Sequence, residues 1–190
     1  FGIRPVVVHG GGPQIGALLR KLGKETEFRD GLRVTDAETL DVARMVLVGK
    51  VSRDIVSAIN RHGPIAVGVS GEDANLIKAA ELDPELGFVG EITGVNPGII
   101  ERLLAENVIP VVSTIGSDAE GQAYKPVYLL SLTREVRSNG FHLYAIPSLA
   151  AALPTDIAGL RDVLVQSKGL SRLAEHDRAG DTQDLITAIP

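Results

Sequence analysis

Three consecutive glycines, Gly10-Gly11-Gly12, follow the β-branched run Val6-Val7-Val8 and precede the expected start of a helix. Glycine has no Cβ, so this turn can adopt positive φ and bring backbone N–H groups close to a ligand. The helix that follows points its positive end at the same place, which favours an anion. The residues therefore predict an anion-binding turn, although a tight strand-to-helix junction would use the same glycines.

Arg33 is the second residue that suits an anion. It lies in the segment Gly31-Leu32-Arg33-Val34-Thr35, and a guanidinium can bind a carboxylate through two parallel hydrogen bonds. The alternative reading is a surface arginine with no ligand. If the chain folds so that Arg33 faces the glycines, the two features predict a site for a small acid.

Other side chains with possible chemistry lie in loops that follow strands. In an open α/β sheet, ligands bind beyond the carboxyl ends of the strands, and three loops qualify: 10–12, 70–75 and 114–122. Glu72 and Asp73 suit a metal or a base, or else a solvated turn. His9 suits a ligand contact, or else a hydrogen-bonded structural role.

Several familiar site patterns are absent from the sequence. The glycines lack the spacing of a dinucleotide fingerprint, and no lysine followed by serine or threonine completes a Walker-type loop. The four histidines show no metal-ligand spacing, and nothing resembles a nucleophile elbow. Phosphoryl transfer in this chain would therefore need a different phosphate cradle.

The elements that must position these residues alternate between strand and helix. Strands are expected at 5–9, 65–69 and 109–113, an antiparallel pair at 76–79 and 88–93, and helices at 14–22 and after Asn96-Pro97. Thr35-Asp36-Ala37-Glu38 matches a capping box that opens a helix ending near Gly49, and Ser52 is expected to cap the next one. This order predicts an α/β fold with a mainly parallel central sheet.

Composition narrows the class of protein. The 190 residues include 44% hydrophobic and only 4% aromatic side chains, which suits a parallel sheet covered by helices. The net charge is −5 with no basic stripe, so we expect no nucleic-acid partner. No apolar run approaches the roughly 20 residues that span a bilayer, and cysteine is absent. We therefore expect a cytoplasmic protein with no membrane partner.

Five segments, taken in order, resemble the acetylglutamate kinases of the amino-acid kinase family. They are His9–Ile15, Gly31–Thr35, Asp41–Leu47, Val67–Ala74 and Pro110–Ile115. The resemblance covers residues 1–124 and implies a three-layer sandwich of which this chain is an incomplete copy. The chain opens at Phe1 and enters a strand at once, so we expect a preceding strand to be missing.

The resemblance also implies a reaction. It is the ATP-dependent phosphorylation of the γ-carboxylate of N-acetyl-L-glutamate in arginine biosynthesis, with Mg²⁺ as the expected metal and a homo-oligomer as the expected assembly. Gly10, Gly11 and Gly12 would form the phosphate cradle. Gly11 and Gly12 would also approach the substrate, and Arg33 would bind its α-carboxylate.

The chain departs from the family after Tyr124. Lys125-Pro126-Val127-Tyr128 stands where the family has Asn-x-Asn-Ala-Asp, whose first asparagine would bind substrate. Residues 1–124 therefore predict an acetylglutamate-binding lobe, and residues 125–190 form an unrecognised tail in place of the nucleotide-binding lobe. Two alternatives stay open: a non-catalytic sensor module that binds acetylglutamate or arginine, and an aspartate or carbamate kinase of the same fold.

Overall fold

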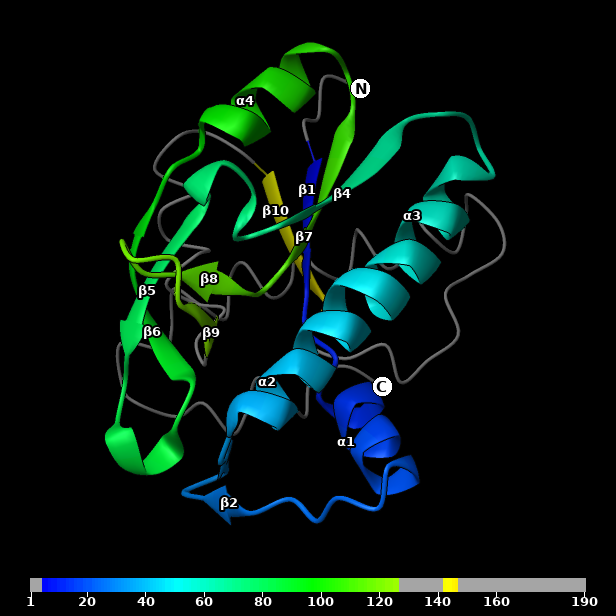
Figure 1. The fold of residues 1–190 in the computed structure, drawn as a ribbon. Helices are drawn as coiled ribbons and strands as arrows, with labels where there is room; N and C mark the ends of the chain where they lie inside the picture. Colours follow the sequence, from blue (N-terminus) through cyan, green and yellow to red (C-terminus); the bar gives the residue numbers. More distant parts are fainter. Residues whose placement is uncertain (1–4, 127–141, 147–190) are drawn as a thin grey trace, which may run out of the picture. The chain divides into compact units, whose positions relative to one another are not determined.

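The protein is described by a computed structural model that covers residues 5–126 and 142–146 (Figure 1). Of the unrecognised tail, residues 125–190, the structure describes only Lys125, Pro126 and one strand at 142–146. Within the described ranges, every helix is too short or too polar to cross a membrane.

A four-stranded parallel sheet forms the centre of the fold, in the order β10-β1-β7-β4. Its strands are β1 (Pro5–His9), β4 (Ala66–Ser70), β7 (Ile109–Ser113) and β10 (His142–Ile146), and β1 pairs in parallel with both β10 and β7. The predicted α/β class with a parallel sheet is therefore confirmed. The strand expected at 65–69 is β4, which has one paired neighbour in the described sheet, and its Val67 is 36% exposed.

One long helix replaces the two that the sequence predicts. α2 (Ala37–Arg44) continues through a π-helical segment, η1 (Met45–Val51), into α3 (Ser52–Asn60), as Figure 1 shows. The expected stop near Gly49 was wrong, because Gly49 keeps a negative φ and helical hydrogen bonding. Ser52 caps nothing, since Val51 before it is also helical.

The start of this helix also differs from the capping-box expectation. Its N-cap is Asp36, whose Oδ1 accepts a hydrogen bond from the Thr39 N–H at 2.8 Å. Thr35 is instead buried, and its hydroxyl donates to the Arg33 carbonyl at 2.9 Å. The cap therefore sits one residue later, and Thr35 links the helix entrance to the strand that carries Arg33.

The remaining elements lie around the sheet. α1 (Gly12–Lys21) follows the glycine turn, and α4 (Gly98–Ala105) precedes β7. β2 (Phe28–Arg29) and β3 (Leu32–Arg33) form a small antiparallel hairpin. The antiparallel pair is β5 (Ile77–Glu81) with β6 (Val89–Val95), and β8 (Gly116–Ser117) and β9 (Ala123–Pro126) close it into a small barrel.

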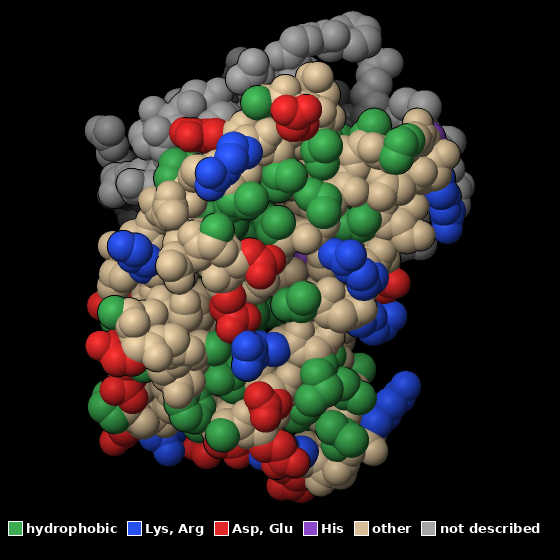
Figure 2. All heavy atoms as spheres, turned by 45° about the horizontal axis from the view of Figure 1, so that its top comes forward, with side chains coloured by type: hydrophobic (Ala, Val, Ile, Leu, Met, Phe, Trp, Pro, Cys, Tyr) green, Lys and Arg blue, Asp and Glu red, His purple; other side chains and the backbone are tan. Residues whose placement is uncertain are grey.

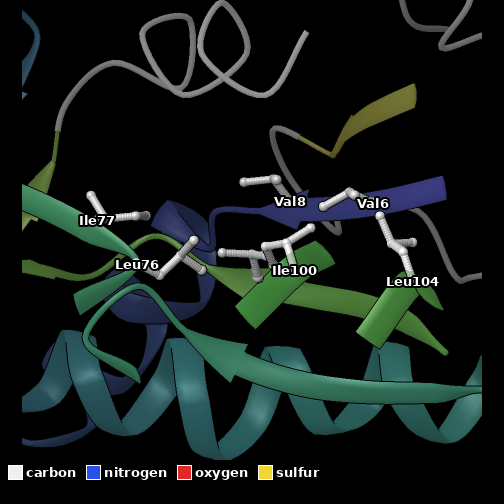
Figure 3. Packing of buried hydrophobic residues seen from close by; sticks show 7 residues of the cluster. Val6, Val8, Leu76, Ile77, Ile100 and Leu104 are labelled. Carbon is white, nitrogen blue, oxygen red and sulfur yellow. The ribbon is translucent and has the colours of Figure 1, made fainter. Parts of the chain in front are cut away.

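A cluster of aliphatic side chains fixes β1 against its neighbours (Figure 3). Val6 and Val8 come from β1, and Ile100 and Leu104 come from α4. Leu76 and Ile77 join them from the start of the small barrel. All six are buried, so the strand that leads into Gly10 is held rigidly.

Charged side chains are mixed on the molecular face drawn in Figure 2. Acidic and basic groups of the described residues alternate there, without a continuous basic area. Such a mixed surface gives no long-range attraction for a polyanion on this face.

Candidate functional site

The carboxyl ends of three parallel strands meet at one level of the sheet. His9 of β1 and Ser70 of β4 are both in register with Ser113 of β7. The loops that follow these strands are the three that the sequence singled out. The three loops therefore begin at the same edge of the sheet.

The glycine turn differs from expectation in its backbone conformation. None of the three glycines has a positive φ, and Gly11, the N-cap of α1, has an extended φ of 177°. Gly11 is required for space, because an added Cβ would lie 2.8 Å from Leu47 Cδ2 and 3.2 Å from Val51 Cγ2. A Cβ on Gly12 would meet nothing within 4 Å. Gly12 thus faces open space that a ligand can use.

Each carbonyl of the turn is hydrogen-bonded within the chain. The Gly10 oxygen lies 3.1 Å from His9 Nδ1, the Gly11 oxygen accepts from the Ile15 N–H at 2.9 Å, and the Gly12 oxygen accepts from Arg33 Nη2 at 3.4 Å. In a trans peptide the N–H points opposite to the carbonyl. The Gly11 and Gly12 N–H groups therefore point away from these partners. Pro13, the next residue, has no N–H.

Arg33 lies beside this turn, and only 9% of its surface is exposed. Its guanidinium carbon lies 4.7 Å from the centroid of the Phe28 ring across the small hairpin, a cation–π distance. Arg33 Nη1 is buried and has no hydrogen-bond partner among the described residues. A buried, unpaired guanidinium nitrogen is costly unless a ligand satisfies it.

A second cation lies in the same electrostatic environment. Burial lowers the pKa of the Arg33 guanidinium, and the positive charge of Arg20 adds to this effect. The pKa of Lys125 is also lowered, first by burial and then by the charge of Arg33. A bound anion would stabilise both cations, the buried Arg33 and the half-buried Lys125, which repel each other. The sequence marked Lys125 only as a departure from the family and gave no sign that it lies near Arg33.

His9 belongs to a buried hydrogen-bond network behind the turn. Its Nε2 lies 3.1 Å from Ser113 Oγ, and Ser113 Oγ lies 3.3 Å from the carbonyl oxygen of Leu47 in η1. Burial lowers the pKa of His9, and the contact with the Gly10 carbonyl opposes that shift. His9 is 0% exposed, which agrees with the structural reading of this residue.

Glu72 and Asp73 make contacts typical of a structural turn. Asp73 Oδ2 accepts from the Ser70 N–H at 2.7 Å, and Glu72 pairs with Arg44 at 2.8 Å. Among the described residues, no three His, Cys, Asp or Glu side chains are grouped to hold a metal ion. The loop therefore stabilises the end of β4, and both carboxylates already have partners.

Comparisons with known proteins agree on one family. A model of the amino acid kinase family matches residues 1–133. An acetylglutamate kinase of Acidothermus cellulolyticus is 54% identical over 134 residues, which cover 67% of this chain and 45% of that protein. An acetylglutamate kinase of Syntrophobacter fumaroxidans is 43% identical over 175 residues, covering 85% of this chain and 56% of that protein. The chain thus spans about half the length of these relatives.

A solved structure supports the fold. The N-acetylglutamate synthase of Neisseria gonorrhoeae, determined with coenzyme A and N-acetyl-glutamate, superposes with a TM-score of 0.63. The match covers 91% of this chain and 45% of that one, at 18% sequence identity. At this identity the likeness concerns the fold alone.

Proposed function

Because this chain belongs to the amino acid kinase family, we propose that it binds N-acetyl-L-glutamate for ATP-dependent phosphorylation of the γ-carboxylate, a step of arginine biosynthesis. The observation that carries this proposal is the buried, unpaired Nη1 of Arg33 beside the glycine turn. Relatives that are named acetylglutamate kinases and are 43–54% identical support the choice of substrate.

Arg33 has the chemistry to hold the α-carboxylate of the substrate. A guanidinium presents parallel N–H donors that match the two oxygens of a carboxylate. Arg33 Nη2 already contacts the Gly12 carbonyl, and Nη1 has no partner among the described residues. The first contact fixes the side chain, and the second nitrogen is left for the ligand.

The Gly11 and Gly12 N–H groups suit the reacting end of the substrate. Phosphoryl transfer spreads negative charge over the transferred oxygens, and fixed N–H donors stabilise it. Gly10 supplies the carbonyl that orients this cradle. ATP would supply the phosphoryl group, and Mg²⁺ is commonly held by nucleotide phosphates with few protein ligands.

A coupled assay of ADP release tests the proposal directly. The 190-residue chain is incubated with ATP, Mg²⁺ and N-acetyl-L-glutamate, with L-aspartate and carbamate as alternative acceptors. We expect ADP release that depends on N-acetyl-L-glutamate. ADP release that follows L-aspartate or carbamate instead would assign the chain to another reaction of the same family.

A second candidate function is a binding module without turnover. It is favoured by Lys125, which stands where the family has the first asparagine of its Asn-x-Asn-Ala-Asp motif. Calorimetry separates the two functions, because the module binds N-acetyl-L-glutamate or arginine without affinity for ATP. A chain that binds both N-acetyl-L-glutamate and ATP would count against the module.

We also propose that the chain forms a homo-oligomer. Most apolar side chains of the helix from Leu40 to Val48 are buried in the protein's own core. Met45 differs, since 61% of its surface is exposed. Light scattering on the purified chain gives its mass in solution. A monomer mass at all concentrations would contradict the proposed homo-oligomer.

A further inference from the structure

We propose that His9 is a positioning residue whose Nδ1–H holds the Gly10 carbonyl and thereby directs the Gly11 N–H into the anion site. This inference deepens the proposed function and takes its ligand from it. His9 is fully buried, so the ring acts through the backbone that follows it. In this role the His9 side chain sets the orientation of the peptide that joins Gly10 to Gly11.

The proton on the ring can be assigned from its neighbours. The Gly10 oxygen is a carbonyl and only accepts hydrogen bonds, so the nitrogen 3.1 Å away, Nδ1, carries the proton. Burial lowers the pKa of His9 from 6.5, which makes the ring neutral at pH 7 with a single proton. Nε2 is then unprotonated and lies 3.1 Å from Ser113 Oγ, whose single proton is shared between Nε2 and the Leu47 carbonyl 3.3 Å away.

The ring is held in place from the neighbouring strand. Ser113 lies directly beside His9 in the parallel pairing of β1 and β7, so its hydroxyl reaches Nε2. The next residue, Thr114, donates its hydroxyl to the His9 carbonyl at 3.3 Å. Ser113 at the end of β7 and Thr114 directly after it therefore fix the His9 ring and its backbone.

The consequence for the ligand site follows from peptide geometry. The Gly10 carbonyl and the Gly11 N–H belong to one planar peptide, and no described peptide is cis. Drawing the carbonyl toward Nδ1 therefore turns the N–H to the opposite side. Among the backbone hydrogen bonds of turns and loops in the described residues, none uses the Gly11 N–H. The Gly11 N–H is therefore oriented by His9 and is available to donate a hydrogen bond to an anion.

Two substitutions separate this role from simple packing. His9→Asn places an amide nitrogen where Nδ1 lies, so it can still donate to the Gly10 carbonyl. His9→Gln places its amide nitrogen near the position of Nε2, where it donates to Ser113 Oγ while the Ser113 hydroxyl donates to the Leu47 carbonyl. Both remove the ring, so a purely structural role predicts that the loss of affinity follows the loss of thermal stability in the two variants. Affinity for N-acetyl-L-glutamate is measured by calorimetry, beside thermal melting of each variant.

We expect His9→Asn to keep its affinity within about threefold of the original chain, while His9→Gln loses about tenfold or more, as for one hydrogen bond to a charged group. Equal affinities in the two variants would overturn the inference, and so would a greater loss in His9→Asn.

A measurement on the unsubstituted chain tests the same inference without a ligand. The ¹⁵N chemical shifts of the His9 imidazole at pH 7 report which nitrogen carries the proton. We expect the proton on Nδ1, and a proton on Nε2 would overturn the inference even if N-acetyl-L-glutamate binds. Conversely, a chain that fails to bind N-acetyl-L-glutamate but keeps Nδ1 protonated would refute the proposed substrate and leave the His9 assignment standing.

Discussion

At the scale of single residues, the two glycines of the proposed ligand site have different physical reasons to be glycine. Gly11 is packed against Leu47 and Val51, whereas Gly12 faces open space. The sequence predicts an anion-binding turn, because three glycines before a helix leave N–H groups accessible, and this stays a prediction. It could not predict the packing of Gly11, since that depends on side chains from a helix that is distant in sequence.

Alanine substitutions at Gly11 and at Gly12 distinguish an effect on folding stability from an effect on ligand binding. Gly11→Ala should lower the free energy of unfolding by about 1–3 kcal/mol, because its Cβ overpacks the buried Leu47 and Val51. Gly12→Ala should change it by no more than about 0.5 kcal/mol, as for a surface substitution, but should weaken binding of N-acetyl-L-glutamate. Urea unfolding and calorimetry measure the two effects, and full affinity in Gly12→Ala would argue against a ligand at this glycine.

At the scale of elements, the long helix shows where local sequence signals fail. Gly49 and Ser52 looked like a stop and a cap, yet both lie within continuous helical structure. The buried residues Leu47, Val51 and Ile55 continue one apolar side across this region, and their packing outweighs the modest cost of a helical glycine. The π-helical register depends on the Ser52 N–H bonding to the Leu47 carbonyl. The types of the residues in this segment do not predict this hydrogen bond.

Asp36, the N-cap of α2, stabilises this helix to an extent that depends on pH. The ion-paired hydrogen bond from Lys24, followed by the bonds from Thr39, lowers the pKa of Asp36 to about 2 from 3.8. The folded state therefore gains stability from Asp36 above pH 3.8 and loses it as the pH falls toward 2. Asp36→Ala should cost about 1 kcal/mol at pH 7, the usual value of an N-cap.

Urea unfolding of the original chain and Asp36→Ala between pH 7 and pH 2 checks this prediction. The difference between the two chains should shrink as the pH approaches 2. A difference that stays constant over this range would show that the carboxylate charge contributes nothing to the cap.

At the scale of the whole molecule, the small barrel holds the strand that carries Arg33. Gly87, in the turn between β5 and β6, forms a bridge with Thr35. The Thr35 N–H donates to the Leu86 carbonyl at 2.9 Å, and the Phe88 N–H donates to the Thr35 carbonyl at 2.7 Å. The order of strands and helices could be predicted from periodicity, but this contact joins segments far apart in sequence that share no recognisable pattern.

Gly87→Ala tests the link between the barrel and the site. Gly87 has a φ of +66°, and an added Cβ would lie 2.5 Å from the Thr35 carbonyl oxygen. We expect a loss of stability of about 1–3 kcal/mol, as for a strained backbone position, and weaker binding of N-acetyl-L-glutamate because Thr35 is bonded to Arg33. Thermal melting and calorimetry measure the two losses. Unchanged affinity would mean that the barrel does not position Arg33.

The central claim is that Arg33 and the glycine turn together bind a small dicarboxylic acid. Calorimetric titration of N-acetyl-L-glutamate into the original chain, Arg33→Ala and Arg29→Ala tests it most directly. Arg29 lies on the same hairpin but is exposed and already paired with Glu27 and Glu85, so it controls for loss of one positive charge. We predict that Arg33→Ala weakens binding by about 1.5–3 kcal/mol, as for a charge-assisted hydrogen bond, and that Arg29→Ala binds within about twofold of the original chain, as for an exposed ion pair. Equal affinity in all three chains would contradict the account.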